Sequence, residues 1–362
     1  MKRTLINIAI LSTILGTGMA QAGGWDRSGQ DTSIIVKDGN LLEVTSVSVA
    51  PKITGKYTGA SAGTSTGDVA PDYSFTNIAF RTDINDDFSI ALIQDEPFGA
   101  SVDWATGTGE YTLVKAKIDT KATTLLIAYD LDDVTVFGGL KNQTFGASAQ
   151  VPLNASTLYA ITSTPDTSLG YVVGAAIERP EIALRVALTY HTKITHNVAI
   201  VETLNGASST SSTLTADTPS SFNLDFQTGV AANTLLFGTI RSVKWTQTEL
   251  KPGLYSGSTG GLSLKKFTSD TMSYSIGLGR KFSDEWSGAV TYGTEAAEGT
   301  AGSPLGPTDG YSKMGVGVTY AAEQANITLG VQQINNGSTV APVANMSGNT
   351  TLVTAVKVAY KF

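Results

Sequence analysis

The chain has 362 residues, with 24 basic and 31 acidic side chains, 38 glycines and no cysteine. The acidic balance argues against nucleic acid as a partner, and the absence of cysteine excludes a disulfide scaffold and a lipid-modified N-terminal cysteine. With 13 tyrosines, 12 phenylalanines and only 15% charged residues, the composition is not that of a disordered chain.

The first 22 residues have the three parts of a secretory signal peptide. Lys2 and Arg3 precede an apolar run from Leu5 to Leu15, and Ala20-Gln21-Ala22 supplies the small residues of a cleavage site. Cleavage after Ala22 would raise the acidic excess from seven to nine. Neither this run nor any later stretch approaches the roughly 20 continuous apolar residues of a membrane-spanning helix. We therefore expect an exported chain without a helical anchor.

A period of two runs through most of the remaining chain. Between Ile182 and His191 the even-numbered residues are large and mostly aliphatic, whereas the odd-numbered residues are small or polar. The same alternation recurs over residues 222–231 and 314–320. These segments are predicted to be half-buried strands. The mean hydropathy of the chain is +0.04. A value near zero is consistent with a membrane barrel, because the apolar residues that face lipid and the polar residues that face the lumen cancel in the mean.

Strand length and turn placement favour a transmembrane barrel over a soluble β-sandwich. Candidate strands of about 10 residues are joined alternately by tight turns and long loops. The tight turns are expected at Asn85-Asp86, Asp132-Asp133, Arg179-Pro180, Ala232-Asn233, Ser283-Asp284 and Glu323-Gln324. The long connections lie near residues 57–71, 94–120, 146–167, 196–218, 249–270, 296–309 and 336–349. Residues 41–362 are thus predicted to form an all-β, antiparallel barrel of about fourteen strands, with both termini periplasmic.

One stretch leaves the strand count open. Glu110 to Asp119 alternates well enough to be a separate strand, which would make the total odd. Bacterial barrels have an even number of strands. We therefore interpret this stretch either as part of a long extracellular excursion or as the upper half of a kinked strand that continues through Leu125, Ile127 and Tyr129.

The C-terminal end is the most specific short signal. Counting back by twos from the last residue, Phe362, gives Tyr360, Val358 and Val356, whereas Lys361 and the other odd-numbered residues form the opposite face. This pattern resembles the terminal strand that barrel-assembly machinery recognises, although an ordinary edge strand could have the same sequence. It predicts insertion into a bacterial outer membrane.

Several segments in order resemble the FadL/TodX (OMPP1) family of outer-membrane transporters for long-chain fatty acids and other hydrophobic compounds. They are Pro97-Phe98-Gly99, the strand pair from Gly170-Tyr171 through Arg179-Pro180 to Leu188-Thr189-Tyr190, Lys244-Trp245-Thr246 and the hairpin Gly279-Arg280-Lys281-Phe282-Ser283-Asp284-Glu285-Trp286. The resemblance extends over most of the chain after residue 22.

The resemblance implies a fourteen-stranded barrel with an N-terminal hatch, or plug, inside it. Substrate would be captured among the extracellular loops and released through the barrel or through a gap in its wall. The hatch would be residues 23–40, which is short, and these residues contain no Asn-Pro-Ala motif of the kind common in the family's hatch. We expect a monomer in the bacterial outer membrane that contacts membrane lipid and lipopolysaccharide, and barrel-assembly machinery during biogenesis.

Passive uptake of an oily molecule requires apolar pockets rather than reactive groups. Candidate substrate contacts are therefore the large side chains of the N-terminal segment and loops: Trp25, Phe98, Trp104, Tyr111, Leu113 and Phe145. Packing of the loops into a cap is the alternative role for these residues. A fatty-acid carboxylate would need a cation or backbone donors. The strand alternation places Arg185 and Lys193 on the face toward the lumen, with Lys244 and Lys357 as further candidates.

Two other functions are alternatives to hydrophobic uptake. The main alternative is a general porin for polar solutes, and a third is an adhesin or structural barrel. An enzyme is not expected: His191 and His196 are the two histidines, and no nucleophile motif accompanies them. We expect no catalytic residue, metal or cofactor. The Ser/Thr tract from Ser208 to Thr215 is predicted to be a mobile loop tip.

Overall fold

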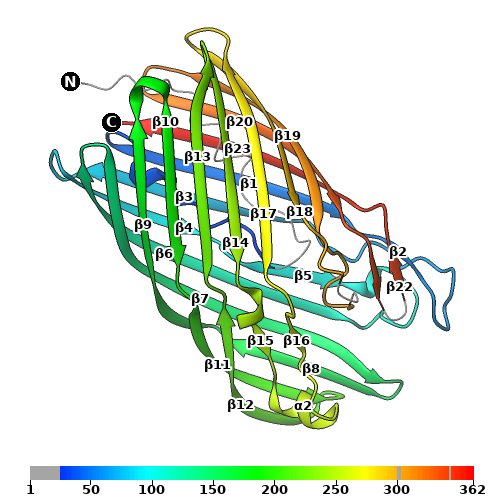
Figure 1. Cartoon of the computed structure of the whole chain (residues 1–362). Helices are drawn as coiled ribbons and strands as arrows, with labels where there is room; N and C mark the ends of the chain where they lie inside the picture. Colours follow the sequence, from blue (N-terminus) through cyan, green and yellow to red (C-terminus); the bar gives the residue numbers. More distant parts are fainter. Residues whose placement is uncertain (1–24, 300–302, 342–343) are drawn as a thin grey trace.

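The computed structural model describes residues 25–299, 303–341 and 344–362, and the predicted signal peptide lies outside them. The described chain is almost entirely antiparallel β-structure (Figure 1). Fourteen of its described strands pair in a closed ring, which confirms the predicted barrel. Consecutive wall strands pair throughout, and β1 closes the ring against β23.

The wall strands, in ring order, are β1 (Leu41–Lys52), β3 (Tyr73–Asp83), β4 (Phe88–Asp95), β6 (Lys115–Leu131), β7 (Val134–Asn154), β9 (Asp166–Arg179), β10 (Leu184–His191), β13 (Ser221–Ala231), β14 (Thr234–Val243), β17 (Thr271–Lys281), β18 (Trp286–Glu295), β19 (Tyr311–Ala321), β20 (Ala325–Asn336) and β23 (Thr350–Lys361). All six predicted tight turns connect strands at one end of this ring.

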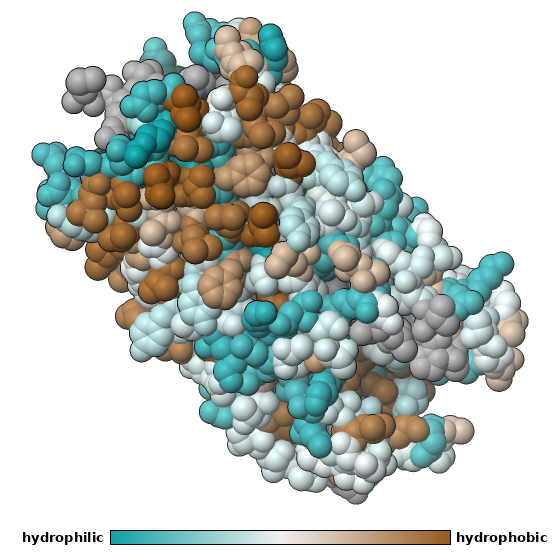
Figure 2. All heavy atoms as spheres, in the orientation of Figure 1, coloured by the Kyte–Doolittle hydropathy of each residue, from teal (hydrophilic) through white to brown (hydrophobic). Residues whose placement is uncertain are grey.

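Alternating side chains give the wall an apolar outer face. On β23, Leu352, Val356 and Tyr360 are exposed, whereas the intervening Ala355 and Lys357 are buried. Large apolar side chains gather over the half of the barrel that carries the C-terminus, and the opposite half is more polar (Figure 2). Exposed aliphatic residues are unfavourable in water but not against lipid, so this band marks the membrane-facing surface.

The strands extend farther at the loop end than the sequence analysis predicted. β7 continues to Asn154 and pairs with β8 (Thr157–Thr164), and β11 (Ile194–Leu204) pairs with both β8 and β12 (Ala207–Thr218). The tract from Ser208 to Thr215 therefore lies within β12, and the prediction of a mobile loop tip was wrong. The reversal is instead made by Asn205 and Gly206, both with positive φ.

The structure shows which part of the stretch from Glu110 to Asp119 is a strand. Residues 110–114 lie outside the strand, in the loop, whereas β6 begins at Lys115 and continues without interruption through Leu125, Ile127 and Tyr129. The stretch is therefore divided between the loop and the upper end of one strand. Its first residues pair with β5 (Gly99–Asp103), and its later residues pair with β4. The strand count therefore stays even.

Shorter elements fill the loop end. They are β2 (Gly55–Tyr57), η3 (Trp104–Thr106), η5 (Trp245–Gln247), β15 (Glu249–Leu250), α2 (Gly253–Ser258), β16 (Lys265–Lys266), β21 (Thr339–Ala341) and β22 (Ala344–Met346). η2 (Ser33–Val36) precedes β1, and η4 (Pro180–Ile182) lies in a tight turn. No helix among the described residues is long and apolar enough to cross a membrane.

The segment before β1 lies against the inner face of the wall. η2 contacts β3, β4 and β6, and the Thr32 hydroxyl lies 3.2 Å from that of Thr189 on β10. Ile34 and Ile35 are buried in a cluster with Leu126 and Val172, whose side chains point inward from β6 and β9. Both apolar and polar contacts therefore fix this segment against the wall.

Candidate functional site

A cavity of about 740 Å³ opens at the loop end of the barrel. The segment from Gly261 to Thr268 lines one side, and Ser303 with residues 305–309 lines another. Trp25, which is only 5% exposed, belongs to the cavity lining and also to that of a smaller pocket. The large cavity and the smaller pocket therefore meet at this tryptophan.

The smaller pocket, of about 50 Å³, is lined mainly by apolar side chains. Its wall side follows from strand register: Val102 of β5 pairs with Ala116 of β6, which pairs with Ala149 of β7. Directly paired residues share one face of a sheet, so these side chains form a row. Because two members are alanines, the row leaves space that loop residues such as Leu250 and Leu264 cover from the opposite side.

Aromatic rings surround Trp25 beside this pocket. The ring centroid of Trp25 lies 5.1 Å from that of Phe267 and 6.2 Å from that of Trp245, both in edge-to-face geometry. Phe98 contacts Trp245 at 5.5 Å, and Phe145 belongs to the same buried cluster. Edge-to-face pairs hold such rings in defined positions. Trp25 is thus held in place by aromatic neighbours at the edge of the pocket.

One cation lies where the cavity and the apolar pocket meet. Lys265 on β16 lines both, and its Nζ lies 4.5 Å from the ring centroid of Phe267. Among the described residues, no carboxylate lies within 4.0 Å of this amine. Burial lowers the pKa of Lys265 from its usual value of 10.5, since removal of water disfavours the charged form. An anionic ligand at this place would stabilise that charge.

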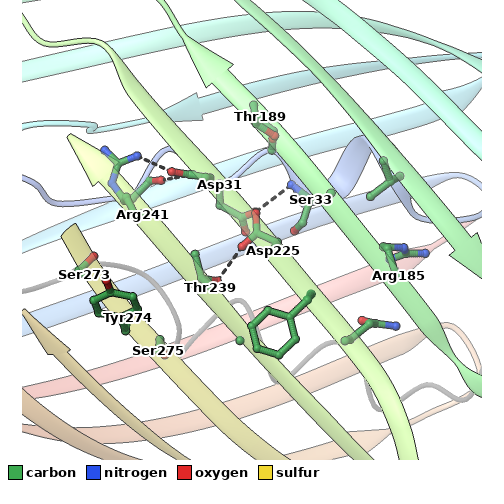
Figure 3. A pocket seen from close by; sticks show the side chains of 18 of the residues that line it. Asp31, Ser33, Arg185, Thr189, Asp225, Thr239, Arg241, Ser273, Tyr274 and Ser275 are labelled. Atoms are coloured by element: carbon green, nitrogen blue, oxygen red, sulfur yellow. Dashed lines mark hydrogen bonds between the residues drawn. The ribbon is translucent and has the colours of Figure 1, made fainter. Parts of the chain in front are cut away.

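Between Trp25 and the tight-turn end of the barrel, the interior is polar. Arg241 of β14 makes two hydrogen bonds to Asp26, at 2.6 and 3.0 Å, and also donates to Asn223 and Gln30. A small pocket of about 80 Å³ lies beside this network (Figure 3). Asp225 and Asp31 both line it, and Thr239 donates to Asp225 at 2.6 Å. An oily molecule would have to displace these charge-assisted hydrogen bonds to pass this way.

The wall is interrupted beside Trp25. β3 pairs with β1 from Tyr73 onward but with β4 only from Ile78, so among the described strands residues 73–77 have a partner on one side only. Glu96, Pro97 and Phe98 separate β4 from β5 at this level. The N-terminal segment crosses here, with the Gly99 amide donating to the Trp25 carbonyl at 2.6 Å.

Arg27 occupies this interruption. Its guanidinium carbon lies 4.5 Å from the ring centroid of Tyr73, and Nη1 lies 3.2 Å from Glu96 and 3.8 Å from Asp119. A Cβ on Gly99 would come within 2.3 Å of the guanidinium carbon, so a larger residue there would displace the end of the Arg27 side chain. Although Arg27 is buried, its charge is paired, as a buried charge requires.

Comparison with known proteins identifies the family. The profile of the family described as "Outer membrane protein transport protein (OMPP1/FadL/TodX)" matches residues 34–358, which is most of the chain. The chain belongs to this family. It is therefore an outer-membrane protein of a transport family. In bacterial barrels the long loops are extracellular and the tight turns periplasmic. Comparison with curated protein sequences finds no match.

Solved structures show the same fold. A FadL homologue from Pseudomonas aeruginosa matches with a TM-score of 0.79 at 15% identity, covering 97% of this chain and 98% of its own. The toluene transporter TodX of Pseudomonas putida matches with a TM-score of 0.65 at 11% identity, covering 97% of both chains. The toluene transporter TbuX of Ralstonia pickettii matches with a TM-score of 0.62 at 11% identity, covering 96% and 98%. At these identities the likeness is one of fold.

The structure divides the predicted contact residues of this OMPP1/FadL/TodX protein into two groups. Trp25, Phe98 and Phe145 lie in the cluster around the apolar pocket. Trp104 and Tyr111, whose rings are 5.0 Å apart, belong instead to a second cluster with Tyr57. Leu113 is 50% exposed, outside both clusters. Their roles as substrate contacts stay predictions.

Each of the four cations that the strand alternation predicted to face the lumen lies beside a carboxylate. Arg185 pairs with Glu178, Lys193 with Asp217 at 2.9 Å, Lys244 with Asp270 at 3.0 Å, and Lys357 with Glu43 at 2.7 Å. Of the four, only Arg185 lines one of the pockets described above, and that pocket is the polar one. Lys265 was missed because it lies in a loop, where strand parity gives no information.

Proposed function

We propose that this protein mediates passive uptake of hydrophobic small molecules across the bacterial outer membrane. The observation that carries the proposal is the lining that the cavity at the loop end shares with the apolar pocket, including Trp25, Leu264 and Lys265. Burial of apolar surface in such a pocket contributes about 25 cal/mol per Å², and transport needs no bond to be made or broken. The site accordingly needs no catalytic residue, metal or cofactor.

The proposed substrate is an amphiphile with an apolar body and a carboxylate, such as a long-chain fatty acid. Its apolar part would occupy the pocket beside Ala116 and Ala149, and its carboxylate would contact Lys265. The toluene transporters with the same fold point to neutral aromatic hydrocarbons as a second substrate class. The two substrate classes can be distinguished by whether binding requires a carboxylate on the ligand.

The proposed exit is the interruption beside Arg27 rather than the lumen. The lumen below Trp25 is filled by charged and hydrogen-bonded groups, among them Asp26, Arg241 and Asp225. The interruption adjoins Trp25 through the backbone contacts at Gly99. In this proposal residues 23–40 form the hatch, residues 41–362 form the barrel, and a monomer suffices. Lateral release into lipid keeps an oily molecule away from water.

A polar-solute porin is the rival function. It would require an open lumen, whereas the described N-terminal residues pack against β3, β4, β6, β10 and β14. The polar pocket in Figure 3 has a volume of only about 80 Å³. These observations support uptake of hydrophobic molecules over general diffusion of hydrophilic ones.

The first test is ligand binding by a variant that fills the pocket. In nanodiscs, Ala149→Phe is expected to lower the affinity for a fluorescent long-chain fatty acid by at least tenfold, because the added ring occupies the ligand's volume. The matched control is Thr162→Phe, since Thr162 is exposed on the opposite face of the same sheet. Equal affinities for the wild type and both variants would overturn the proposed site.

A further inference from the structure

A buried carboxylate outside the substrate pocket joins two parts of the extracellular region. Glu202 of β11 is fully buried, and its oxygens accept hydrogen bonds from the Tyr159 hydroxyl at 2.9 Å, from the amides of Leu254 at 3.2 Å and Tyr255 at 3.1 Å, and from the Ser212 hydroxyl at 3.5 Å. The two amides belong to α2, in the loop between β14 and β17. Tyr159 and Ser212 belong to β8 and β12. Glu202 thus ties this loop to the extracellular sheet.

The tied loop forms one side of the substrate pocket. Residues 249–268, here called the cover loop, supply Leu250, Leu264 and Lys265 to the apolar pocket and much of the lining of the larger cavity. Within the loop, β15 pairs with β16, and the Ser263 hydroxyl donates to Glu249 at 2.5 Å. These contacts fold the cover loop as a unit.

The cover loop has few contacts of its own at its far end. Gly260 and Gly261 both have positive φ, a conformation that costs glycine little, and Leu262 beside them is 61% exposed. The loop meets the sheet at α2, where Glu202 accepts hydrogen bonds from both amides and where Leu254 and Tyr255 pack against the cluster around Trp25. It is also held at its two ends, where β15 contacts β12 and where Leu250 and Phe267 belong to that cluster. The attachment at Glu202 therefore holds the middle of the loop between its two packed ends.

We propose that the cover loop is a lid over the substrate pocket and that Glu202 is the positioning residue that holds it closed. This inference rests on the proposed function, because it assigns the lid to the proposed pocket. Opening would expose the space between the alanine row and Leu264 to the extracellular side. Closing would bring Lys265 back beside the bound ligand.

The chemistry at this position requires a carboxylate. An ionised Glu202 only accepts hydrogen bonds, and here it meets four donors. The isosteric glutamine keeps one accepting oxygen but turns an NH₂ group toward the remaining donors. A buried donor without a partner destabilises the closed position of the loop. The free-energy cost of one such donor changes the equilibrium between the closed and open positions by roughly tenfold. Glu202→Gln should therefore shift the lid toward its open form.

The absence of cysteine from the natural sequence makes this shift measurable. Leu262→Cys introduces a single labelling site on the exposed end of the lid, and a nitroxide there reports lid mobility in nanodiscs. With Glu202→Gln in the same chain, we expect a more mobile label. We also expect a fluorescent fatty acid to associate and to dissociate roughly tenfold faster. The control is Asp217→Asn, whose carboxylate contacts Lys193 and Thr195 and not the lid.

A role confined to folding predicts a different outcome: less folded barrel, but unchanged label mobility and rate constants in the folded fraction. That result would overturn the proposal. If Glu202→Gln does not fold, Leu254→Pro removes one lid amide, and it should give larger changes in mobility and rates than Leu254→Ala, which loses the same side-chain packing but keeps the amide. A more mobile label in a protein that binds no hydrophobic ligand would contradict the proposed function while leaving the attachment of the loop by Glu202 established.

Discussion

At the scale of single residues, Lys265 distinguishes an anionic amphiphile from a neutral oil. Its amine lies at the junction of the two cavities, and its nearest described ring is Phe267. A charged amine held in a partly dry site gains more from a carboxylate than an exposed lysine does. The neighbouring Lys266 provides a comparison, because it lines the larger cavity but not the apolar pocket and its amine lies 3.6 Å from Glu249.

Lys265→Met should weaken binding of a free long-chain fatty acid by about tenfold, the scale of one charge-assisted hydrogen bond. Binding of the corresponding methyl ester should stay unchanged, because the ester has no charge to pair. Lys266→Met should affect neither ligand. Titration calorimetry on nanodisc-embedded protein measures all three. Equal losses for acid and ester with Lys265→Met would show that the amine acts only through packing.

The depressed pKa of Lys265 predicts a pH dependence. The charged form is present below the folded-state pKa and is lost as pH rises through it, and this occurs below the usual 10.5 of a lysine. Affinity for a free fatty acid should therefore decline on the alkaline side before ordinary lysines titrate, while ester affinity stays constant. A flat profile up to pH 10.5 would contradict a contact between the carboxylate and this amine.

At the scale of elements, the wall strands and tight turns could be predicted because their alternation and turn chemistry are local properties. The extracellular strands β8, β11 and β12 are partly polar on their outer faces, and serine and threonine residues such as Thr213 and Thr215 made the sequence of β12 resemble a loop. The row from Val102 to Ala149 depends on the register of three strands, which the sequence pattern alone does not specify. Trp25 was recognisable by its residue type, but Lys265 and Glu202 acquire their roles only through contacts between distant segments.

The interruption of the wall makes a prediction about Arg27. Arg27→Ala removes the guanidinium that fills the space between Tyr73 and Glu96, so delivery of substrate should become several-fold faster while affinity at the apolar pocket stays within about twofold. Uptake by cells and binding in nanodiscs measure the two quantities separately. Arg179→Ala, at a periplasmic turn where Arg179 pairs with Asp133, is the control. Slower or unchanged delivery in Arg27→Ala would argue against this exit.

At the scale of the whole molecule, closure of the barrel depends on the last strand. β23 pairs with both β20 and β1, and its outward residues continue the apolar band to Tyr360. Phe362 stacks on Phe80 at 5.9 Å and on Tyr360 at 6.3 Å. The C-terminus therefore contributes to the membrane-facing surface as well as carrying the predicted assembly signal.

Phe362→Ser should reduce the amount of folded protein in the outer membrane, because it removes the terminal aromatic residue of the predicted assembly signal. The heat-modifiable band on semi-native gels of outer-membrane fractions measures this amount. Phe282→Ser, at an exposed periplasmic turn, is the control for loss of an aromatic residue. Normal assembly of Phe362→Ser would show that recognition does not depend on the final side chain.

The most direct test of the whole account is transport by the intact protein. We would express it in a bacterial strain that lacks its own fatty-acid transporter, and measure uptake of labelled long-chain fatty acid together with swelling of proteoliposomes in sugars. The account predicts restored fatty-acid uptake, abolished by Ala149→Phe, and no sugar-dependent swelling. Rapid swelling without fatty-acid uptake would contradict it and identify a polar-solute porin.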